Sequence, residues 1–212
     1  DIEVYDDNGE LIITLNHLRQ QLDKKGNTPN YCLSDFIAPK DSGICDYIGA
    51  FAVTAGIDIE PLVNTYEDDY DDYNSIMVKA VADRLAEAFA EMMHYKLRTE
   101  LWGYSNEIFN NDDLVKENYT GIRPAPGYPS CPEHSEKDKL WELLDVEKNT
   151  GMTLTSSYAM LPTASVSGWY FANPDSRYFG VAKISQEQVE DYAKRKAISI
   201  DQAEKLLGPN LD

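Results

Sequence analysis

The chain of 212 residues has 37 acidic and 19 basic side chains, so its formal net charge is −18. A field of this sign repels phosphate backbones and anionic lipid headgroups, which disfavours binding to nucleic acids and to membrane surfaces. Hydrophobic residues make up 42% of the chain, a globular proportion. No apolar run reaches the roughly 18 residues that a membrane-spanning helix needs.

Cysteine and histidine are sparse and scattered. The cysteines are odd in number and widely spaced, a pattern typical of reduced thiols in a cytoplasmic protein. They are Cys32, Cys45 and Cys131. Cys131 and His134 could both bind a metal ion, but no second pair follows at zinc-like spacing, so we expect no metal site. His17, His94 and His134 lie on unrelated elements, so we expect each to be a surface or hydrogen-bonded histidine. We expect no catalytic side chains.

The first part of the chain predicts a hairpin and an ambiguous apolar segment. Residues 3–5 and 11–15 are apolar around Asp7-Asn8-Gly9, which favours a hairpin. Residues 47–53 fit either a small-residue helix or a buried strand. Residues 58–72 are rich in carboxylates, which we interpret as a solvated approach to the positive end of the next helix.

The clearest predicted element is a helix from about residue 73 to residue 101. Its apolar side chains fall within an arc of about 160° at helical spacing, so we expect a sheet or other helices to cover them. They are Met77, Val78, Val81, Ala82, Leu85, Ala88, Phe89, Met92 and Met93. On the polar side, Asp83, Glu87 and Glu91 recur every four residues and repel one another mildly. This row is either a solvated acidic face or places a carboxylate to meet a cation.

The second half of the chain predicts a helix and then strands. Residues 136–149 have a helical pattern that ends at Gly151. Three strand-like runs follow, at 153–160, 165–172 and 177–184. Turn residues at 173–176 favour an antiparallel hairpin between the last two runs.

Two helices close the chain, and each begins with a capping-box pattern, Ser185 with Gln188 and Ser199 with Gln202. Gly208-Pro209 ends the second helix. Because helices and strands are segregated rather than alternating, the predicted class is α+β, with a twisted antiparallel sheet packed against helices. The sequence has no Walker loop, Gly-x-Gly-x-x-Gly fingerprint or Gly-x-Ser-x-Gly elbow.

Residues 121–137 are unusually rich in proline and fit neither a helix nor a strand. Each proline fixes φ and removes a backbone donor, so the segment predicts a stiff, largely polyproline-like loop. Its available groups are peptide carbonyls, the amides of Ala125, Gly127 and Tyr128, the Arg123 guanidinium and the Tyr128 phenol. Such a loop can bind a polar ligand with little ordering cost. The alternative is a plain proline-rich connector.

The segment from Arg123 to Lys137 resembles the S-adenosylmethionine-binding loop of the activation domain of cobalamin-dependent methionine synthase. The most specific match is Arg-Pro-Ala-Pro-Gly-Tyr-Pro. Segments similar to the family occur in the same order along nearly the whole chain. They are residues 17–21, 46–54, 71–74, 82–91, 166–171, 178–179, 188–193 and 209–211.

The resemblance implies a reactivation role within a methyltransferase. The parent enzyme methylates homocysteine from methyltetrahydrofolate, and its cobalamin cofactor occasionally oxidises to inactive cob(II)alamin. The activation domain then docks on the cobalamin-binding domain of the same polypeptide, a flavodoxin-type reductase supplies an electron, and S-adenosylmethionine gives its methyl group to cob(I)alamin. The domain alone is expected to have no homocysteine methylation activity.

The resemblance also implies which residues bind S-adenosylmethionine. Arg123 is expected to pair with the methionyl carboxylate, and the backbone of the loop to cradle that end of the ligand. Tyr178 and Phe179 are expected to line the adenosyl end, and Glu87 and Glu117 resemble acids near the sulfonium. The implied set is Arg123, Pro124, Ala125, Pro126, Gly127, Tyr128, Tyr178, Phe179, Glu87 and Glu117.

One departure from the family leaves a second function open. The resemblance implies one activation domain over residues 1–212 that lacks the family's N-terminal segment, which contributes an aspartate to the ligand site. The chain also lacks an initiator Met, so we expect a piece of something longer. The alternative is a non-catalytic module that caps the cobalamin domain without binding S-adenosylmethionine. Because bacterial flavodoxins are acidic too, we expect the reductase to dock at least partly on the cobalamin domain.

Overall fold

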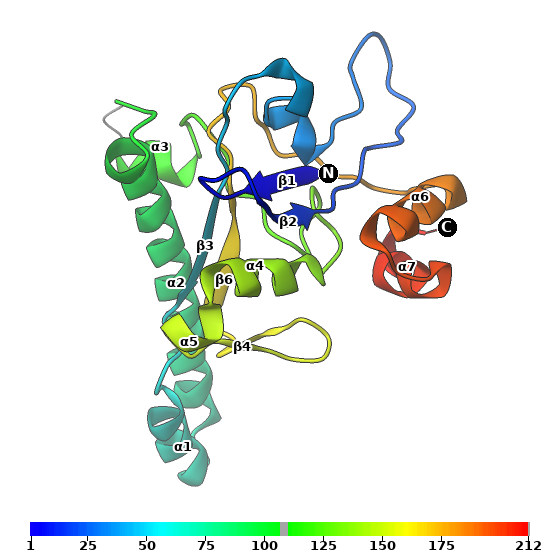
Figure 1. Ribbon diagram of the computed structural model, residues 1–212. Helices are drawn as coiled ribbons and strands as arrows, with labels where there is room; N and C mark the ends of the chain where they lie inside the picture. The colour runs from blue at the N-terminus through cyan, green and yellow to red at the C-terminus, as the bar shows by residue number, and fades with distance from the viewer. Residues whose placement is uncertain (107–109, 212) are drawn as a thin grey trace. The chain divides into compact units, whose positions relative to one another are not determined.

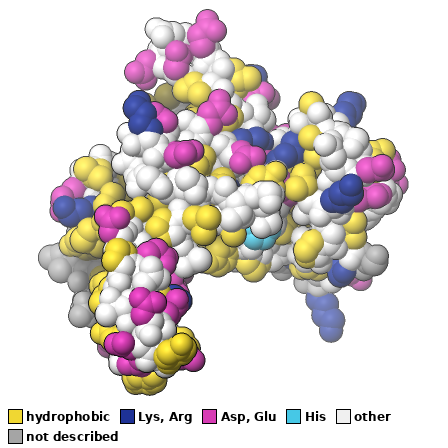
Figure 2. Space-filling model, turned by 90° about the horizontal axis from the view of Figure 1, so that it is seen from below, with side chains coloured by type: hydrophobic (Ala, Val, Ile, Leu, Met, Phe, Trp, Pro, Cys, Tyr) yellow, Lys and Arg dark blue, Asp and Glu magenta, His cyan; other side chains and the backbone are white. Residues whose placement is uncertain are grey.

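The computed structural model describes residues 1–106 and 110–211 (Figure 1). It divides into two compact units. Unit 1 comprises Asp1–Gly49, Gly121–Lys139 and Trp169–Asp212, and unit 2 comprises Ala50–Thr120 and Leu140–Gly168. Every helix within the described residues is too short or too polar to span a bilayer. Acidic side chains are spread over the face drawn in Figure 2, in keeping with the net charge of −18.

Unit 1 begins with the predicted hairpin, which is confirmed. β1 (Ile2–Tyr5) pairs antiparallel with β2 (Leu11–Leu15). The Asp6 carboxylate accepts hydrogen bonds from the amides of Asn8 and Glu10, and this closes the turn. Two 3-10 helices follow, η1 (Leu33–Phe36) and η2 (Lys40–Ser42).

The first of the two C-terminal helices is tied to the segment after β2. α6 (Gln186–Lys196) begins after Ser185, whose hydroxyl accepts a hydrogen bond from the amide of Gln188. The predicted reciprocal bond from the Gln188 side chain to the Ser185 amide is wrong. That amide donates to the Gln21 side chain, and the Gln188 side chain bonds the backbone amide and carbonyl of Arg19.

The second C-terminal helix, α7 (Ile200–Leu207), begins with the predicted capping box between Ser199 and Gln202. A 3-10 turn, η4 (Gly208–Asn210), follows it. α6 and α7 lie side by side (Figure 1) and, with side chains from two loops, form a hydrophobic core in unit 1. The core residues are Leu18, Val181, Ile184, Val189, Tyr192, Ala193, Ala203 and Leu207.

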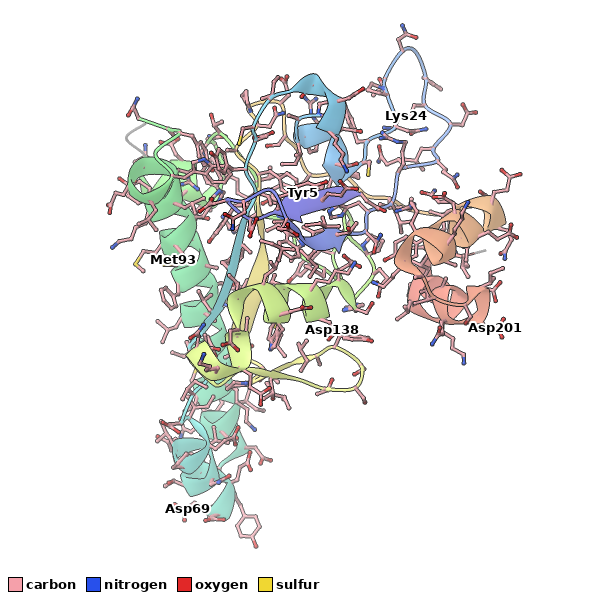
Figure 3. All side chains as sticks on the ribbon, in the orientation of Figure 1. Tyr5, Lys24, Asp69, Met93, Asp138 and Asp201 are labelled. Carbon is pink, nitrogen blue, oxygen red and sulfur yellow. The ribbon has the colours of Figure 1, made fainter. Side chains whose placement is uncertain are left out.

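Unit 2 contains the long helix. α2 (Asp72–Lys96) continues as a π-helix, η3 (Leu97–Leu101), so the predicted helix at 73–101 is confirmed. The acidic segment before it is more ordered than predicted, because it folds as a further helix, α1 (Glu60–Asp68), which packs on α2. In Figure 3 the long helix runs from just after the labelled Asp69 to beyond Met93. A short helix, α3 (Asn111–Val115), follows.

The predicted packing face of α2 is wrong. The buried residues of the helix are small or polar: Ser75, Ala82, Ala86, Ala90 and His94. Most of the larger apolar residues stay exposed, with Leu85 56% and Val81 49% accessible. Small side chains let a helix backbone approach its neighbours closely, and hydrophobic periodicity does not distinguish that face from the bulkier one beside it.

The strands form small two-stranded sheets rather than one larger sheet. β3 (Gly49–Thr54) pairs with β6 (Ser165–Tyr170), so the ambiguous segment at 47–53 contains a strand. This pair is antiparallel, because Gly49 lies against Tyr170 while the Ala55 amide bonds the Ala164 carbonyl. β4 (Thr153–Leu154) and β5 (Met160–Leu161) form another short antiparallel pair.

The predicted strand at 177–184 is also wrong. The segment is irregular, because its amides bond loop carbonyls: Val181 donates to Pro129, and Ile184 donates to Asn210. Ala182 has a φ of 58°, which no strand accommodates. The turn at 173–176 does form, but it leads into this irregular segment instead of into a hairpin.

The predicted helix at 136–149 is divided in two. α4 (Glu136–Leu144) stops at Asp145, which takes a left-handed φ of 46°, and α5 (Val146–Thr150) follows. Gly151 ends α5 with a φ of 75°, as its position predicts.

Candidate ligand-binding site

The ligand loop (residues 121–134) is anchored at its start by backbone hydrogen bonds within unit 1. Ile122 exchanges two bonds of 3.0 Å with Phe171, and the Trp169 amide donates to the Pro124 carbonyl at 2.9 Å. Arg123 lies between these two anchored residues. Its backbone position is therefore fixed on both sides.

Two reverse turns shape the middle of the ligand loop. The Tyr128 amide donates to the Ala125 carbonyl at 3.2 Å, and the Cys131 amide donates to the Tyr128 carbonyl at 2.9 Å. The Gly127 amide donates across to Cys131 at 2.7 Å. The predicted polyproline-like course is thus replaced by turns, and two of the three amides that we expected to face a ligand are used inside the loop.

Gly127 is required at the turn for two reasons. Its φ is 94°, a conformation that costs other residues free energy. A Cβ atom there would also lie 2.4 Å from Cε1 of His134. The imidazole is held in place by the Lys137 ammonium, which lies 3.0 Å from Nδ1. Burial and this neighbouring charge lower the pKa of His134.

The polar candidates on the ligand loop, Arg123 and Tyr128, are more exposed than Pro124 and Pro126. Pro124 and Pro126 are buried, whereas the Tyr128 side chain is 63% exposed and Arg123 is half-buried. The Tyr178 hydroxyl, on a residue 47% exposed, accepts a hydrogen bond from the Arg123 amide at 3.0 Å. The structure therefore brings together two residues of the predicted set, Arg123 and Tyr178, which we expected at the carboxylate and at the adenosyl end.

Phe179 lies deeper than Tyr178. Its ring centroid is 6.0 Å from that of Tyr31 and 6.4 Å from that of Phe36, and it packs on the core of unit 1. Arg177 and Lys24 place their cationic groups 5.3 and 4.9 Å from the centre of the Tyr31 ring. Phe179 thus belongs to an aromatic cluster behind Tyr178.

The two candidate carboxylates lie in unit 2. Glu87 is on α2, is exposed, and forms an ion pair with Arg84 at 2.7 Å. Glu117 follows α3 with a left-handed φ of 52°, and a turn fixes its backbone. Glu91, the next carboxylate of the same acidic row, is largely covered and accepts a hydrogen bond from the Tyr119 hydroxyl.

A buried acidic pair at the end of the ligand loop had no signal in the sequence pattern. Glu133 is 2% exposed and contacts the ammonium of Lys196 at 2.8 Å, and Glu136 contacts the same ammonium. Burial alone would raise the pKa of Glu133, but Lys196 and the hydrogen bonds from Ser135 outweigh it, so the pKa lies below its ordinary value. A contact between residues 63 apart in sequence leaves no local pattern.

His17 is buried, contrary to the expectation of a surface or hydrogen-bonded residue. It is 4% exposed, and among the described residues neither ring nitrogen has a hydrogen-bond partner. Burial, assisted by the positive N-terminus, Lys139 and Arg195, lowers its pKa to about 3. Within residues 1–106 and 110–211, no group of three or more His, Cys, Asp or Glu residues is arranged to hold a metal ion.

The fold and the ligand loop define an α+β domain with a proline-rich segment held in a fixed, partly exposed conformation. A family model described as the activation domain of vitamin B12 dependent methionine synthase matches residues 1–197, and the chain belongs to this family. A crystal structure of the MetH reactivation domain bound to AdoHcy is 59% identical, with a TM-score of 0.96. The match covers 99% of this chain and 65% of that one, so the chain spans just under two thirds of its relative's length. The resemblance and the fold class are thereby confirmed.

Proposed function

We propose that this chain is the reactivation domain of a cobalamin-dependent methionine synthase. It binds S-adenosylmethionine and presents the methyl group to cob(I)alamin during the reductive methylation of cob(II)alamin. The observation that carries this proposal is the anchored Arg123–Tyr128 segment, in a chain 59% identical to a domain bound to AdoHcy. AdoHcy is S-adenosylmethionine without the methyl group, so a site for one has the shape for the other.

The residues of the ligand loop bind and orient the methionyl end of the ligand. Arg123 supplies a planar guanidinium that matches a carboxylate in bidentate geometry. Because its amide donates to the Tyr178 hydroxyl, the backbone at Arg123 needs little further ordering on binding. The backbone from Pro124 to Tyr128 forms the cradle, through Ala125, Pro126 and Gly127. Tyr178 lines the adenosyl end, and Phe179 supports it from behind.

Glu87 and Glu117 are proposed to attract the sulfonium. A sulfonium has no proton to donate, so a carboxylate holds it by Coulombic attraction alone. At an effective dielectric between protein and water, each carboxylate contributes about 1 kcal/mol. S-Adenosylmethionine supplies an electrophilic methyl group, and cobalamin, bound by another domain of the parent enzyme, accepts it. The protein's own contribution is orientation.

The proposal extends to the partners and the setting. The cobalamin-binding domain of the same polypeptide and a flavodoxin-type reductase are the partners, with no nucleic acid and no membrane. As part of a methyltransferase, the domain alone has no homocysteine methylation activity. Because the chain has a net charge of −18, an acidic reductase docks at least partly on the cobalamin domain. The thiols of Cys32, Cys45 and Cys131 are unpaired, which supports a cytoplasmic setting.

Calorimetric titration with S-adenosylmethionine and S-adenosylhomocysteine tests the proposal. The titration is done on this chain and on a version extended at its N-terminus. Saturable binding to either version, with one site, supports a ligand-binding reactivation domain. If neither version binds either ligand, the domain only caps the cobalamin domain, and the proposed function is overturned.

A further inference from the structure

We propose that a buried ion-pair network positions the ligand loop, with Lys196 as its central residue. The network, called the loop clamp here, consists of Glu133, Glu136, Lys139 and Lys196, all in unit 1. The inference rests on the proposed function, since it assigns the clamp to S-adenosylmethionine binding. The clamp residues touch no ligand in this scheme, so they are positioning residues.

Glu133 links the end of the ligand loop to α6. Its carboxylate accepts hydrogen bonds from the Ser135 amide at 2.6 Å, the Ser135 hydroxyl at 2.7 Å and the Tyr192 hydroxyl at 3.0 Å. The Lys196 ammonium donates a fourth bond at 2.8 Å. Tyr192 and Lys196 are one turn apart on α6, so a single helix face holds the loop.

Glu136 links the same ammonium to the first strands. Its carboxylate accepts bonds from Lys139 at 2.8 Å, from the Asn16 amide at 2.9 Å and from Lys196. Lys139 also donates to the Asn16 side chain at 2.6 Å. Glu136 therefore joins the segment after β2 to Lys196 in the last turn of α6, and Lys196 also holds Glu133 at the loop end.

The clamp is charge-balanced, with two carboxylates and two ammonium groups. Balance is what a buried cluster requires, because an unpaired buried charge is strongly unfavourable. A buried ion pair stabilises a fold little more than an apolar replacement of the same volume, and sometimes less. The ion pairs of the loop clamp instead contribute specificity of position, since each bond fixes one position of the loop end.

The position of Glu133 is transmitted to the ligand-facing part of the loop. His134, the next residue, packs its ring against Gly127, and the Gly127 amide bonds Cys131. A shift at Glu133 therefore moves His134 and loosens the turns that carry Ala125 and Tyr128. Loss of the clamp lowers the population of the binding-competent loop and lowers apparent affinity in proportion.

The first test replaces Lys196 by methionine, which keeps the length of the side chain but removes its charge. We expect about tenfold weaker binding of S-adenosylmethionine and of S-adenosylhomocysteine, as for a loop that is competent a tenth of the time. The loss is equal for the two ligands because the loop, and not the sulfonium, is affected. Lys148→Met, which removes the exposed ion pair with Asp145, is the matched control and leaves affinity unchanged.

A second variant separates positioning from stability. Lys196→Met leaves the cluster with an excess negative charge, and Glu133→Gln in the same chain restores the balance. We expect the double variant to regain the urea midpoint of the parent chain while its ligand affinity stays low. If affinity returns together with stability, the cluster is only structural and the inference is overturned.

A readout without ligand distinguishes a failure of the inference from a failure of the proposed function. In Lys196→Met, hydrogen exchange at the amides of Gly127 and Cys131 should quicken about tenfold, because these bonds close the turns. Exchange in the β1–β2 hairpin should not change. Unchanged exchange at both loop amides overturns the inference. Absence of ligand binding by both this chain and its N-terminally extended version instead overturns the proposed function, and the exchange result still decides the role of the clamp.

Discussion

Arg123 is placed on a backbone that is hydrogen-bonded on both sides. The bonds at Ile122 and Pro124 fix its neighbours, and Tyr178 fixes its own amide. A guanidinium on a fixed backbone costs less entropy to order when a carboxylate binds than one on a mobile loop, because only its side chain has to be ordered. The sequence motif identified the residue, but the anchoring partners are more than 40 positions away and leave no trace in the motif itself.

Arg123→Ala is expected to weaken S-adenosylmethionine binding by about 2–4 kcal/mol, the usual loss when one partner of a largely desolvated charge pair is removed. Arg123→Lys should recover little, because an ammonium lacks the planar fork. Calorimetry on the two variants and on the control Lys148→Ala measures the difference. Unchanged affinity in Arg123→Ala would remove the residue from the site.

Glu87→Gln tests whether the acidic row on α2 includes a binding carboxylate. We expect the variant to weaken S-adenosylmethionine more than S-adenosylhomocysteine, because only the first ligand has a sulfonium charge. Asp83→Asn, one turn earlier on the same helix, is the matched control and should affect neither ligand. Equal losses for both ligands would leave Glu87 as the surface partner of Arg84.

Gly127→Ala tests the turn at the centre of the ligand loop. Gly26 also has a positive φ, 78°, but a Cβ there meets nothing within 4 Å, so Gly26→Ala is a control for backbone strain alone. That control is expected to lose about 1–2 kcal/mol of unfolding free energy. Gly127→Ala should lose more, because the new methyl group also displaces His134 from Lys137. Similar losses in urea denaturation would show that the imidazole moves aside freely.

At the scale of elements, the sequence pattern predicted those features that depend only on residues close together in the chain. The hairpin at β1–β2, the long helix and the Ser199 cap all follow from spacing over a few residues. The face of α2 that packs and the irregular segment at 177–184 depend on distant partners. Residues 177–184 have strand-like side chains, yet Pro129 and Asn210 supply the carbonyls that their amides bond. The loop clamp is of the same kind, since its charges come from separate segments.

Trp169 is the largest fully buried side chain of the described residues and lies on β6. Its side chain is 1% exposed, so Trp169→Ala is expected to lower the free energy of unfolding by about 3–5 kcal/mol. Chemical denaturation measures this value, with Tyr128→Ala, on an exposed loop residue, as the control. A loss below about 1 kcal/mol would mean that the indole contributes little to packing.

At the scale of the whole molecule, two buried groups, Glu133 and His17, make the free energy of unfolding depend on pH. The pKa of Glu133 is depressed in the folded chain, so its contribution to stability is present above the ordinary carboxyl pKa and is lost as pH falls through the folded value. As the pH falls, His17 begins to lower the stability of the fold at a higher pH than Glu133 does. Its ring is neutral when folded and becomes protonated only in the unfolded chain over most of the weakly acidic range.

The pKa of His17 is lowered from 6.5 to about 3 by burial and by nearby positive charges. Above pH 6.5 both states are neutral, and His17 contributes no pH dependence. Between pH 6.5 and about 3 the unfolded chain binds the additional proton, so stability falls as pH falls, by about 2 kcal/mol at pH 5. Near pH 7.5 we expect His17→Leu to have the same free energy of unfolding as the parent chain. The buried ring has no hydrogen-bond partner among the described residues, so replacing it by an apolar side chain of similar size costs little. Urea denaturation from pH 7.5 to 5 measures both slopes, and parallel curves for the two proteins would show that His17 is already protonated in the folded state.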